Sequence, residues 1–314
     1  MGKGLDTTLA ILNGLIGDYL TRTENGLATE MSFYHRDRPL AAERAALEAA
    51  FPTASPRFAV FVHGLMNTEH IWRWPDGNDY GSLLERDLGW TAAYLRYNTG
   101  VAIPDNGARL SALLEQLLAA YPTEIEELAL IGFSMGGLVI RSACHAAVTA
   151  QHTWPARVRR IVYIGTPHLG APAERVGKFT SDVLRAIPNA YTRLVSDIAN
   201  LRSVGIQDLA HATLRHEDRV PAQSVWDLRD ARHPAPLHAQ IEHHVIAGSL
   251  FGDDKLGFAF GDSLVPISSA TYSGIADQLL PRERVHVLPG LNHIALAHDP
   301  AVYEILKASL KDPP

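Results

Sequence analysis

Residues 128–140 read Leu-Ala-Leu-Ile-Gly-Phe-Ser-Met-Gly-Gly-Leu-Val-Ile, and no other segment says as much about the architecture. They place a G-x-S-x-G motif, with Ser134 at its centre, between an apolar run typical of a strand and one typical of a helix. A serine on such a sharp turn has a strained backbone, and Gly132 and Gly136 leave room where a Cβ would clash. The motif is weak in isolation, but this context predicts that Ser134 projects from the carboxyl end of a sheet as a nucleophile.

Short apolar runs recur on both sides of this segment and alternate with helical patterns. The nearly continuous apolar runs are 58–62, 92–97, 128–131, 158–164, 244–247 and 285–288. Such runs are typical of parallel strands that are covered on both faces. Residues 108–121 carry leucines at helical spacing, and residues 135–148 are also helical in pattern. The alternation predicts an α/β protein with a mostly parallel central sheet and helices on both faces.

We expect the α/β core to comprise residues 51–172 and 241–314. The remaining segments are expected to be additions to this core. The stretch 173–240 mixes short helical pieces, at 181–187 and 194–201, with prolines at 188, 221, 234 and 236. We interpret it as a helical cap or lid over the site, with a second independent domain as the alternative. Residues 1–50 are expected to pack on the core as an N-terminal extension. Within them, the run 7–20 predicts an amphipathic helix, and a membrane-surface or lid helix is the alternative.

A serine hydroxyl needs a neighbouring base, and the base needs a third group to orient it. After a motif of this kind the acid and then the histidine should follow along the chain, each in a loop after a late strand. His293 comes after the run 285–288 and before a helical pattern at 300–310, so we predict it as the base. His298 is the alternative.

The acid is predicted to be Asp262, within Gly-Asp-Ser-Leu-Val-Pro at 261–266. Asp253 and Asp254 lie nearer the end of the preceding strand and remain alternatives, as does Glu174. An aspartate in such a loop would otherwise be a turn or cap residue.

A negatively charged oxygen that forms during the reaction needs backbone N–H donors. One should come from Met135, directly after the serine, and the other from the loop after an early strand. The strand at 58–62 ends in His-Gly, and Gly64 allows the chain to turn so that Leu65 N–H faces the site, with Met66 as the alternative donor. His63 is interpreted as a structural histidine that bonds the loop.

The aromatic stretch after that loop, Ile-Trp-Arg-Trp-Pro at 71–75, is a candidate wall for an apolar pocket. We therefore name Met66, Trp72 and Trp74 as candidate substrate-pocket residues. Ordinary packing of the loop explains the same stretch equally well.

Composition and charge limit the kinds of partner, location and metal site that we expect. The net charge is −6 and no basic stripe is present, which argues against nucleic acid. Cys144 is the only cysteine, so no intramolecular disulfide can form, as in a reducing compartment. The chain has no clear secretory signal and no apolar segment of the roughly 20 residues that span a bilayer, so we expect a cytoplasmic protein. His233, His238, His243 and His244 lack paired ligand spacing, and we predict no metal site.

Together these residues resemble the α/β-hydrolase lipases and esterases. The resemblance is carried by 61–65, 132–137, 261–266, Asn292-His293 and a Gly-Thr-Pro-His-Leu-Gly run at 165–170, and it covers roughly 58–310. The run at 165–170 is similar to that of the bacterial lipase and GPI inositol-deacylase-like branch.

This resemblance implies a catalytic triad of Ser134, Asp262 and His293, with Leu65 and Met135 as oxyanion donors and no organic cofactor. Some secreted members hold a structural calcium and a disulfide. Here the single cysteine excludes the disulfide, and no acidic cluster in the sequence indicates a calcium site.

The expected activity is hydrolysis of a small-molecule or lipid-like carboxylic ester through an acyl-enzyme on Ser134. Transient contact with a membrane surface is compatible with such a substrate. The same residues could serve an acyltransferase, a lactonase, an amidase or a thioesterase. A non-catalytic binding protein of the same fold is the alternative from a different class.

Overall fold

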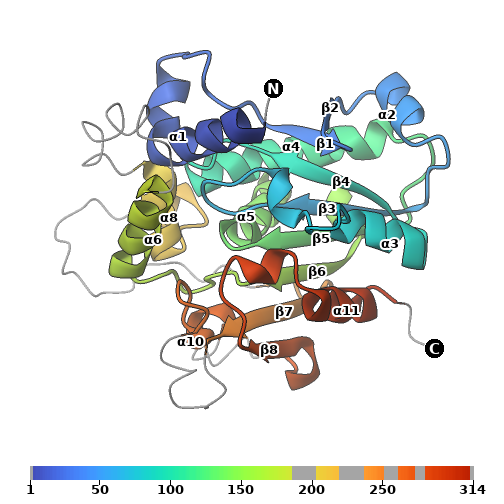
Figure 1. The fold of residues 1–314 in the computed structure, drawn as a ribbon. Helices are drawn as coiled ribbons and strands as arrows, with labels where there is room; N and C mark the ends of the chain where they lie inside the picture. The colour runs from blue at the N-terminus through green and yellow to red at the C-terminus, as the bar shows by residue number, and fades with distance from the viewer. Residues whose placement is uncertain (1–2, 186–202, 219–236, 251–260, 273–279, 312–314) are drawn as a thin grey trace.

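The computed structural model describes residues 3–185, 203–218, 237–250, 261–272 and 280–311. These residues form one eight-stranded sheet in the order β2-β1-β4-β3-β5-β6-β7-β8 (Figure 1). The pairs from β4 to β8 are parallel, and β1 is antiparallel to both β2 and β4. The strands are β1 (Ser32–His35), β2 (Arg38–Leu40), β3 (Arg57–Val62), β4 (Thr91–Arg96), β5 (Glu127–Phe133), β6 (Val158–Ile164), β7 (Glu242–Ser249) and β8 (Val285–Pro289).

Helices connect the strands and cover both faces of the sheet. The α-helices are α1 (Lys3–Arg22), α2 (Arg44–Ala50), α3 (Tyr80–Leu88), α4 (Ile103–Ala120), α5 (Met135–Ala150), α6 (Ala173–Arg185), α8 (Val204–His211), α10 (Ile267–Ala270) and α11 (Pro300–Ser309). Short 3-10 helices are η1 (Glu69–Trp72), η2 (Trp154–Arg157), η3 (His216–Asp218), η4 (Arg282–Arg284) and η5 (Ala295–Ala297).

The near-continuous apolar strands follow from burial on both faces. In β3, Phe58, Val60 and Val62 pack into a core shared with α1, α4, α5 and α8. Ala59 and Phe61 point the other way, into a core shared with α3 and α11. Successive side chains of a strand point to opposite faces, so every position must be apolar when both faces are covered.

All six predicted strands are present, and each agrees within a few residues at its ends. The helical patterns at 108–121 and 135–148 correspond to α4 and α5, and the tail pattern at 300–310 corresponds to α11. The predicted α/β fold, with a mostly parallel sheet, is therefore confirmed.

The N-terminal residues contain the predicted helix and a hairpin that the sequence analysis did not anticipate. Helix α1 buries Ile11, Leu15 and Leu20 in the main core. The strands β1 and β2 extend the sheet beyond β4. They have only four and three residues, β2 contains Pro39, and their burial is mixed, so no periodic pattern marks them.

The predicted cap at 173–240 lies only partly within the described residues. Helix α6 covers the first part of the expected piece at 181–187, whereas the piece at 194–201 and the prolines at 188, 221, 234 and 236 lie outside the described residues. Helix α8 packs against α1, α4 and α6. Among the described helices, none is both long and apolar enough to traverse a bilayer.

Candidate active site

Ser134 occupies a sharp turn between β5 and α5. Its backbone has φ 53° and ψ −125°, a conformation that non-glycine residues rarely adopt. Its N–H donates to the carbonyl of Ile164 at the end of β6, with N···O 2.8 Å. Strain of this kind persists only where surrounding structure enforces it, and it is concentrated at functional sites.

Neighbouring glycines allow three chain segments to meet at this turn. A Cβ on Gly136 would overlap the carbonyl oxygen of Val62, at the end of β3. A Cβ on Gly64 would lie 2.8 Å from Cβ of Ser134. The loop after β3 therefore lies directly against the serine, as the predicted role of this loop requires.

The predicted acid and base form a buried pair. Asp262 Oδ2 lies 2.7 Å from Nδ1 of His293, and the two residues are only 1% and 3% exposed. The other carboxylate oxygen, Oδ1, accepts hydrogen bonds from Leu264 N (3.1 Å) and Val265 N (2.8 Å). The backbone also joins the two loops, because His293 N donates to Asp262 O at 2.9 Å.

This arrangement determines what the imidazole can do. With Nδ1–H donated to Asp262, Nε2 carries the lone pair of the neutral ring. Nε2 is buried and has no hydrogen-bond partner among the described residues. It is therefore available to take a proton from a neighbouring group.

His293 and Ser134 lie at the same edge of the sheet. The imidazole is 5.0 Å, centroid to centroid, from the ring of Phe133, the residue before the serine. A Cβ on Gly165, the residue after Ile164, would lie 3.2 Å from Cε1 of His293. In the described residues no hydrogen bond joins Ser134 Oγ to His293 Nε2. Such bonds are often long in ligand-free active sites.

The alternatives for acid and base are placed differently. Asp253 and Asp254 lie outside the described residues. Glu174 is exposed in the first turn of α6. His298 is half-buried at the end of η5, and its Nδ1 is buried with no partner among the described residues.

The three candidate amide donors differ in their hydrogen-bond partners. Met66 N–H donates to Oγ1 of Thr99 at 3.1 Å, so this amide is already engaged. Within the described residues Leu65 N–H and Met135 N–H have no acceptor, and Met135 is the first residue of α5, whose N-terminal amides carry partial positive charge.

His63 is held inside the loop, as its interpretation as a structural histidine requires. Its Nδ1 lies 2.9 Å from the carbonyl of Gly64, and its ring stacks on Tyr97 with centroids 4.6 Å apart. Burial lowers the pKa of His63 to about 4, partly offset by the bond to Gly64. The ring is therefore neutral at pH 7.

Other buried histidines also have a pKa that burial lowers. We therefore predict that the folded protein loses stability in acid. Burial also lowers the pKa of His243 to about 4, where Tyr163 and the carbonyl of His238 are its partners. The ordinary pKa of histidine is about 6.5, so the neutral native form is favoured above that pH. We expect the free energy of unfolding to fall between pH 6.5 and 4, by at most about 3 kcal/mol for each such histidine.

Urea unfolding across this pH range measures the effect. His243→Gln should flatten the pH dependence, whereas His145→Gln, at an exposed position, should leave it unchanged. If the free energy of unfolding falls equally steeply with decreasing pH in the wild type and in His243→Gln, His243 does not contribute to the acid sensitivity.

The candidate pocket residues lie largely in packed surroundings. Trp72 is fully buried against Phe61 and Phe133, with centroids 5.2 and 6.1 Å apart. Trp74 packs on Tyr80 and Tyr303. These contacts favour the packing interpretation for both tryptophans. Met66 lies against α1.

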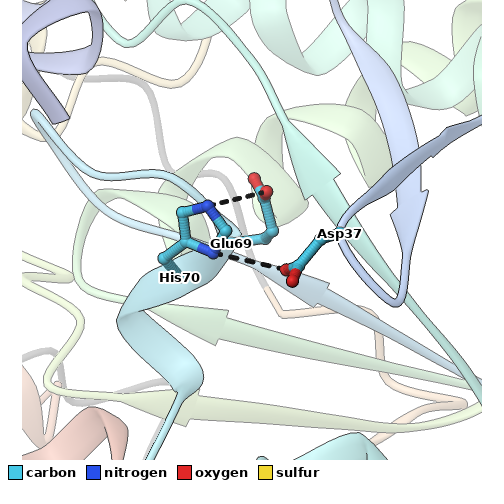
Figure 2. A group of neighbouring side chains, drawn as sticks. All are labelled: Asp37, Glu69 and His70. Carbon is cyan, nitrogen blue, oxygen red and sulfur yellow. Dashed lines mark ion pairs between the residues drawn. The ribbon is translucent and has the colours of Figure 1, made fainter. Parts of the chain in front are cut away.

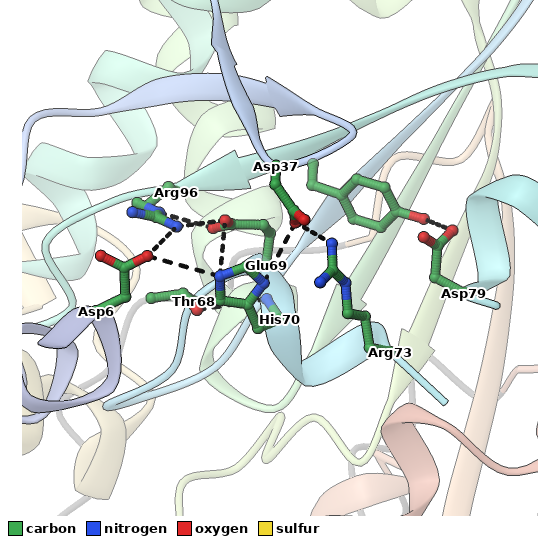
Figure 3. A network of polar contacts seen from close by, with 9 residues as sticks. Asp6, Asp37, Thr68, Glu69, His70, Arg73, Asp79 and Arg96 are labelled. Atoms are coloured by element: carbon green, nitrogen blue, oxygen red, sulfur yellow. Dashed lines mark hydrogen bonds and ion pairs between the residues drawn. The ribbon is translucent and has the colours of Figure 1, made fainter. Parts of the chain in front are cut away.

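Asp37, in the β1–β2 turn, forms a polar cluster with Glu69 and His70 of η1. One ligand atom from each lies within 4.8 Å of the others, as a metal site would require (Figure 2). Both carboxylates, however, already pair with guanidinium groups, Glu69 with Arg96 and Asp37 with Arg73 (Figure 3). His70 Nε2 also lies 3.6 Å from Asp6 of α1. We interpret the cluster as an ion-pair network that joins α1, the β1–β2 turn and η1 to β4.

A second polar network behind the site was missed by sequence reasoning. His168, in the run at 165–170, has Nδ1 3.2 Å from Nη1 of Arg141. Nη2 of the same guanidinium donates to Tyr272 OH. His168 N donates to the carbonyl of Ser269 in α10, at 3.1 Å. Burial and the Arg141 charge hold the pKa of His168 well below its usual range. The network ties the loop after β6 to the segment that follows Asp262.

The strand order, the strained serine turn and the buried Asp–His pair together define the α/β-hydrolase class of fold. Comparison with solved structures agrees. A lipase from Bacillus licheniformis superposes with a TM-score of 0.52 at 19% identity, covering 83% of this chain and 94% of the lipase. The chain therefore has the α/β-hydrolase fold.

A family model matches part of the chain. The profile described as "PGAP1-like alpha/beta domain" matches residues 98–243. Other similar structures are a thioesterase from the prodiginine pathway of Streptomyces coelicolor (16% identity, TM-score 0.47, 82% and 92% covered) and a Pyrococcus furiosus esterase (15%, 0.45, 82% and 83%). A search of curated proteins gave no match. The profile match lies within residues 58–310, where the motifs predicted the resemblance, and the α/β-hydrolase fold that the resemblance implied is confirmed.

Proposed function

We propose that the protein is a serine hydrolase that cleaves carboxylic esters through an acyl-enzyme on Ser134. The observation that carries this proposal is the conjunction of a strained, buried serine with a His293–Asp262 pair at the same edge of the sheet. The imidazole Nε2 in this pair has no partner among the described residues.

The chemistry follows from the roles of these atoms. Ser134 Oγ attacks the ester carbonyl while His293 Nε2 takes its proton, and Asp262 stabilises the imidazolium through Nδ1–H. The resulting oxyanion accepts hydrogen bonds from Leu65 N–H and Met135 N–H. Collapse of the tetrahedral intermediate expels the alcohol, which takes its proton from His293. Water, activated by the same imidazole, then hydrolyses the acyl-enzyme.

The substrate proposed is a small, lipophilic ester. Leu65 is apolar and buried, and it follows Gly64, where a Cβ would lie 2.8 Å from Cβ of Ser134. Met135, the first residue after the serine, is also buried and apolar. Charged or sugar-like acyl groups would find few polar partners among these side chains.

Labelling with a fluorophosphonate probe tests this proposal. We expect stoichiometric modification of Ser134, identified by peptide mass spectrometry, and hydrolysis of p-nitrophenyl esters that varies with acyl chain length. Competition with an added alcohol separates a hydrolase from an acyltransferase, because the latter yields a new ester. A protein that neither labels nor turns over any ester would be a binding protein, and the proposal would fail.

A further inference from the structure

The loop after β3, residues 63–68, is held between helix α1 and the segment that follows β4. Tyr97 OH donates to the carbonyl of His63 at 2.8 Å, and Thr99 Oγ1 accepts from Met66 N at 3.1 Å. Both partners come from the segment after β4, and both are nearly inaccessible to solvent. The loop is therefore bonded on each side of Leu65.

Met66 has an unusual backbone that needs this support. Its φ is 58°, in the left-handed region that side-chain-bearing residues rarely adopt. Such a conformation persists only where the surroundings enforce it. The bond from Met66 N–H to Thr99 is one constraint on it.

Helix α1 supplies the second constraint on Met66, by packing against its side chain. A Cβ on Gly14 would overlap the Met66 side chain, so the helix can lie against Met66 only because residue 14 is glycine. The segment after β4 is attached to the same helix, since Asn98 Nδ2 donates to the carbonyl of Gly17 at 2.9 Å. Helix α1, Thr99 and Met66 thus form one packed unit.

The orientation of Leu65 N–H follows from the geometry of this unit. Gly64 lies against Ser134, and Met66 is fixed two residues later, so the peptide groups between them have little freedom. If Met66 N–H left Thr99, the turn could relax to a less strained conformation and would turn the Leu65 amide away.

We propose that Thr99 is a positioning residue: by accepting Met66 N–H against the Gly14 face of α1, it aims the Leu65 amide at the oxyanion formed on Ser134. This inference rests on the proposed function. Thr99 acts through the loop and does not itself contact the substrate. The same proposal gives the N-terminal helix α1 a role, because α1 packs against Met66 and so supports the loop.

The test is Thr99→Val, which keeps the shape of the side chain and removes the acceptor oxygen. Loss of one oxyanion donor costs about 10²- to 10³-fold in kcat. Because the donor is only misdirected here, we expect kcat to fall by about 10- to 100-fold with KM nearly unchanged. Thr99→Ser, which keeps the hydroxyl, should restore kcat to near the wild-type value.

A transition-state analogue provides a readout that a structural role would not move. A trifluoromethyl ketone adds to the serine and forms an oxyanion, so its Ki should rise by the same factor by which kcat/KM falls. Thr91→Val is the matched control. The Thr91 hydroxyl also accepts a backbone N–H, from Ser55 at 3.1 Å, at the opposite end of β4. We expect Thr91→Val to lower the melting temperature but to leave kcat and Ki unchanged.

Gly14→Ala tests the same unit if Thr99→Val does not fold. Its added methyl group displaces Met66 from the side of α1, so the same loss of kcat at constant KM is expected. Wild-type kcat and Ki in both variants would overturn the positioning role while leaving the esterase proposal intact. A wild-type protein that fails to label at Ser134 would overturn the esterase proposal and this inference with it.

Discussion

Ser134→Ala is expected to lower kcat for a p-nitrophenyl ester by about 10⁵- to 10⁶-fold, because it removes the oxygen that we propose forms the acyl-enzyme. The residual rate comes from the amide donors and from binding. Alanine has the same steric limits on φ as serine, so the strained turn and the fold should persist. Thermal unfolding monitored by circular dichroism, together with steady-state kinetics, checks both expectations.

Ser142→Ala is the matched control for this substitution. Ser142 lies in α5, the helix that begins directly after Ser134; it is buried and donates to the carbonyl of Leu214 at 2.8 Å. Its loss should lower stability by about 1 kcal/mol without changing kcat. A Ser134→Ala protein with near-normal turnover would exclude Ser134 as the nucleophile.

The second large effect is expected for Asp262→Asn, at about 10⁴-fold in kcat. Leu264 N–H and Val265 N–H both donate to Oδ1, so the asparagine oxygen must occupy that position. The amide NH₂ then faces Nδ1 of His293, which can only accept. The ring proton is forced onto Nε2, which can no longer take the proton of the serine.

Side-by-side kinetics with the other candidate acids measure this effect. Asp253→Asn, Asp254→Asn and Glu174→Gln should keep wild-type kcat, because none of them orients His293 in this scheme. If Asp254→Asn loses activity while Asp262→Asn keeps it, Asp254 and not Asp262 is the acid of the triad.

Much of this architecture was predictable because its causes are local. Burial on both faces favours an unbroken apolar run through the middle of strands such as β5 (residues 128–131) and β6 (residues 161–164), and a tight strand-to-helix turn requires small residues at 132 and 136. These constraints act within a few residues of each other and so leave a pattern in the chain. The β1–β2 hairpin leaves none, because its short strands are only partly buried and owe their place to pairing with β4.

The amino-acid sequence by itself indicated the six strands from β3 to β8, the serine turn and the candidate partners in loops 261–266 and 289–293. It could not choose between chemically equivalent groups. Leu65 and Met66 are adjacent apolar residues, and either amide could have been the free donor. Only the tertiary structure distinguishes the two amides, because it brings Thr99, from the segment after β4, to Met66 N–H and places Gly14 of α1 against the Met66 side chain. In the same way, Trp72 became a core residue through its contacts with Phe61 and Phe133. The physical reason is that a hydrogen bond or a packing contact depends on distances in space, and residues far apart in the sequence supply them.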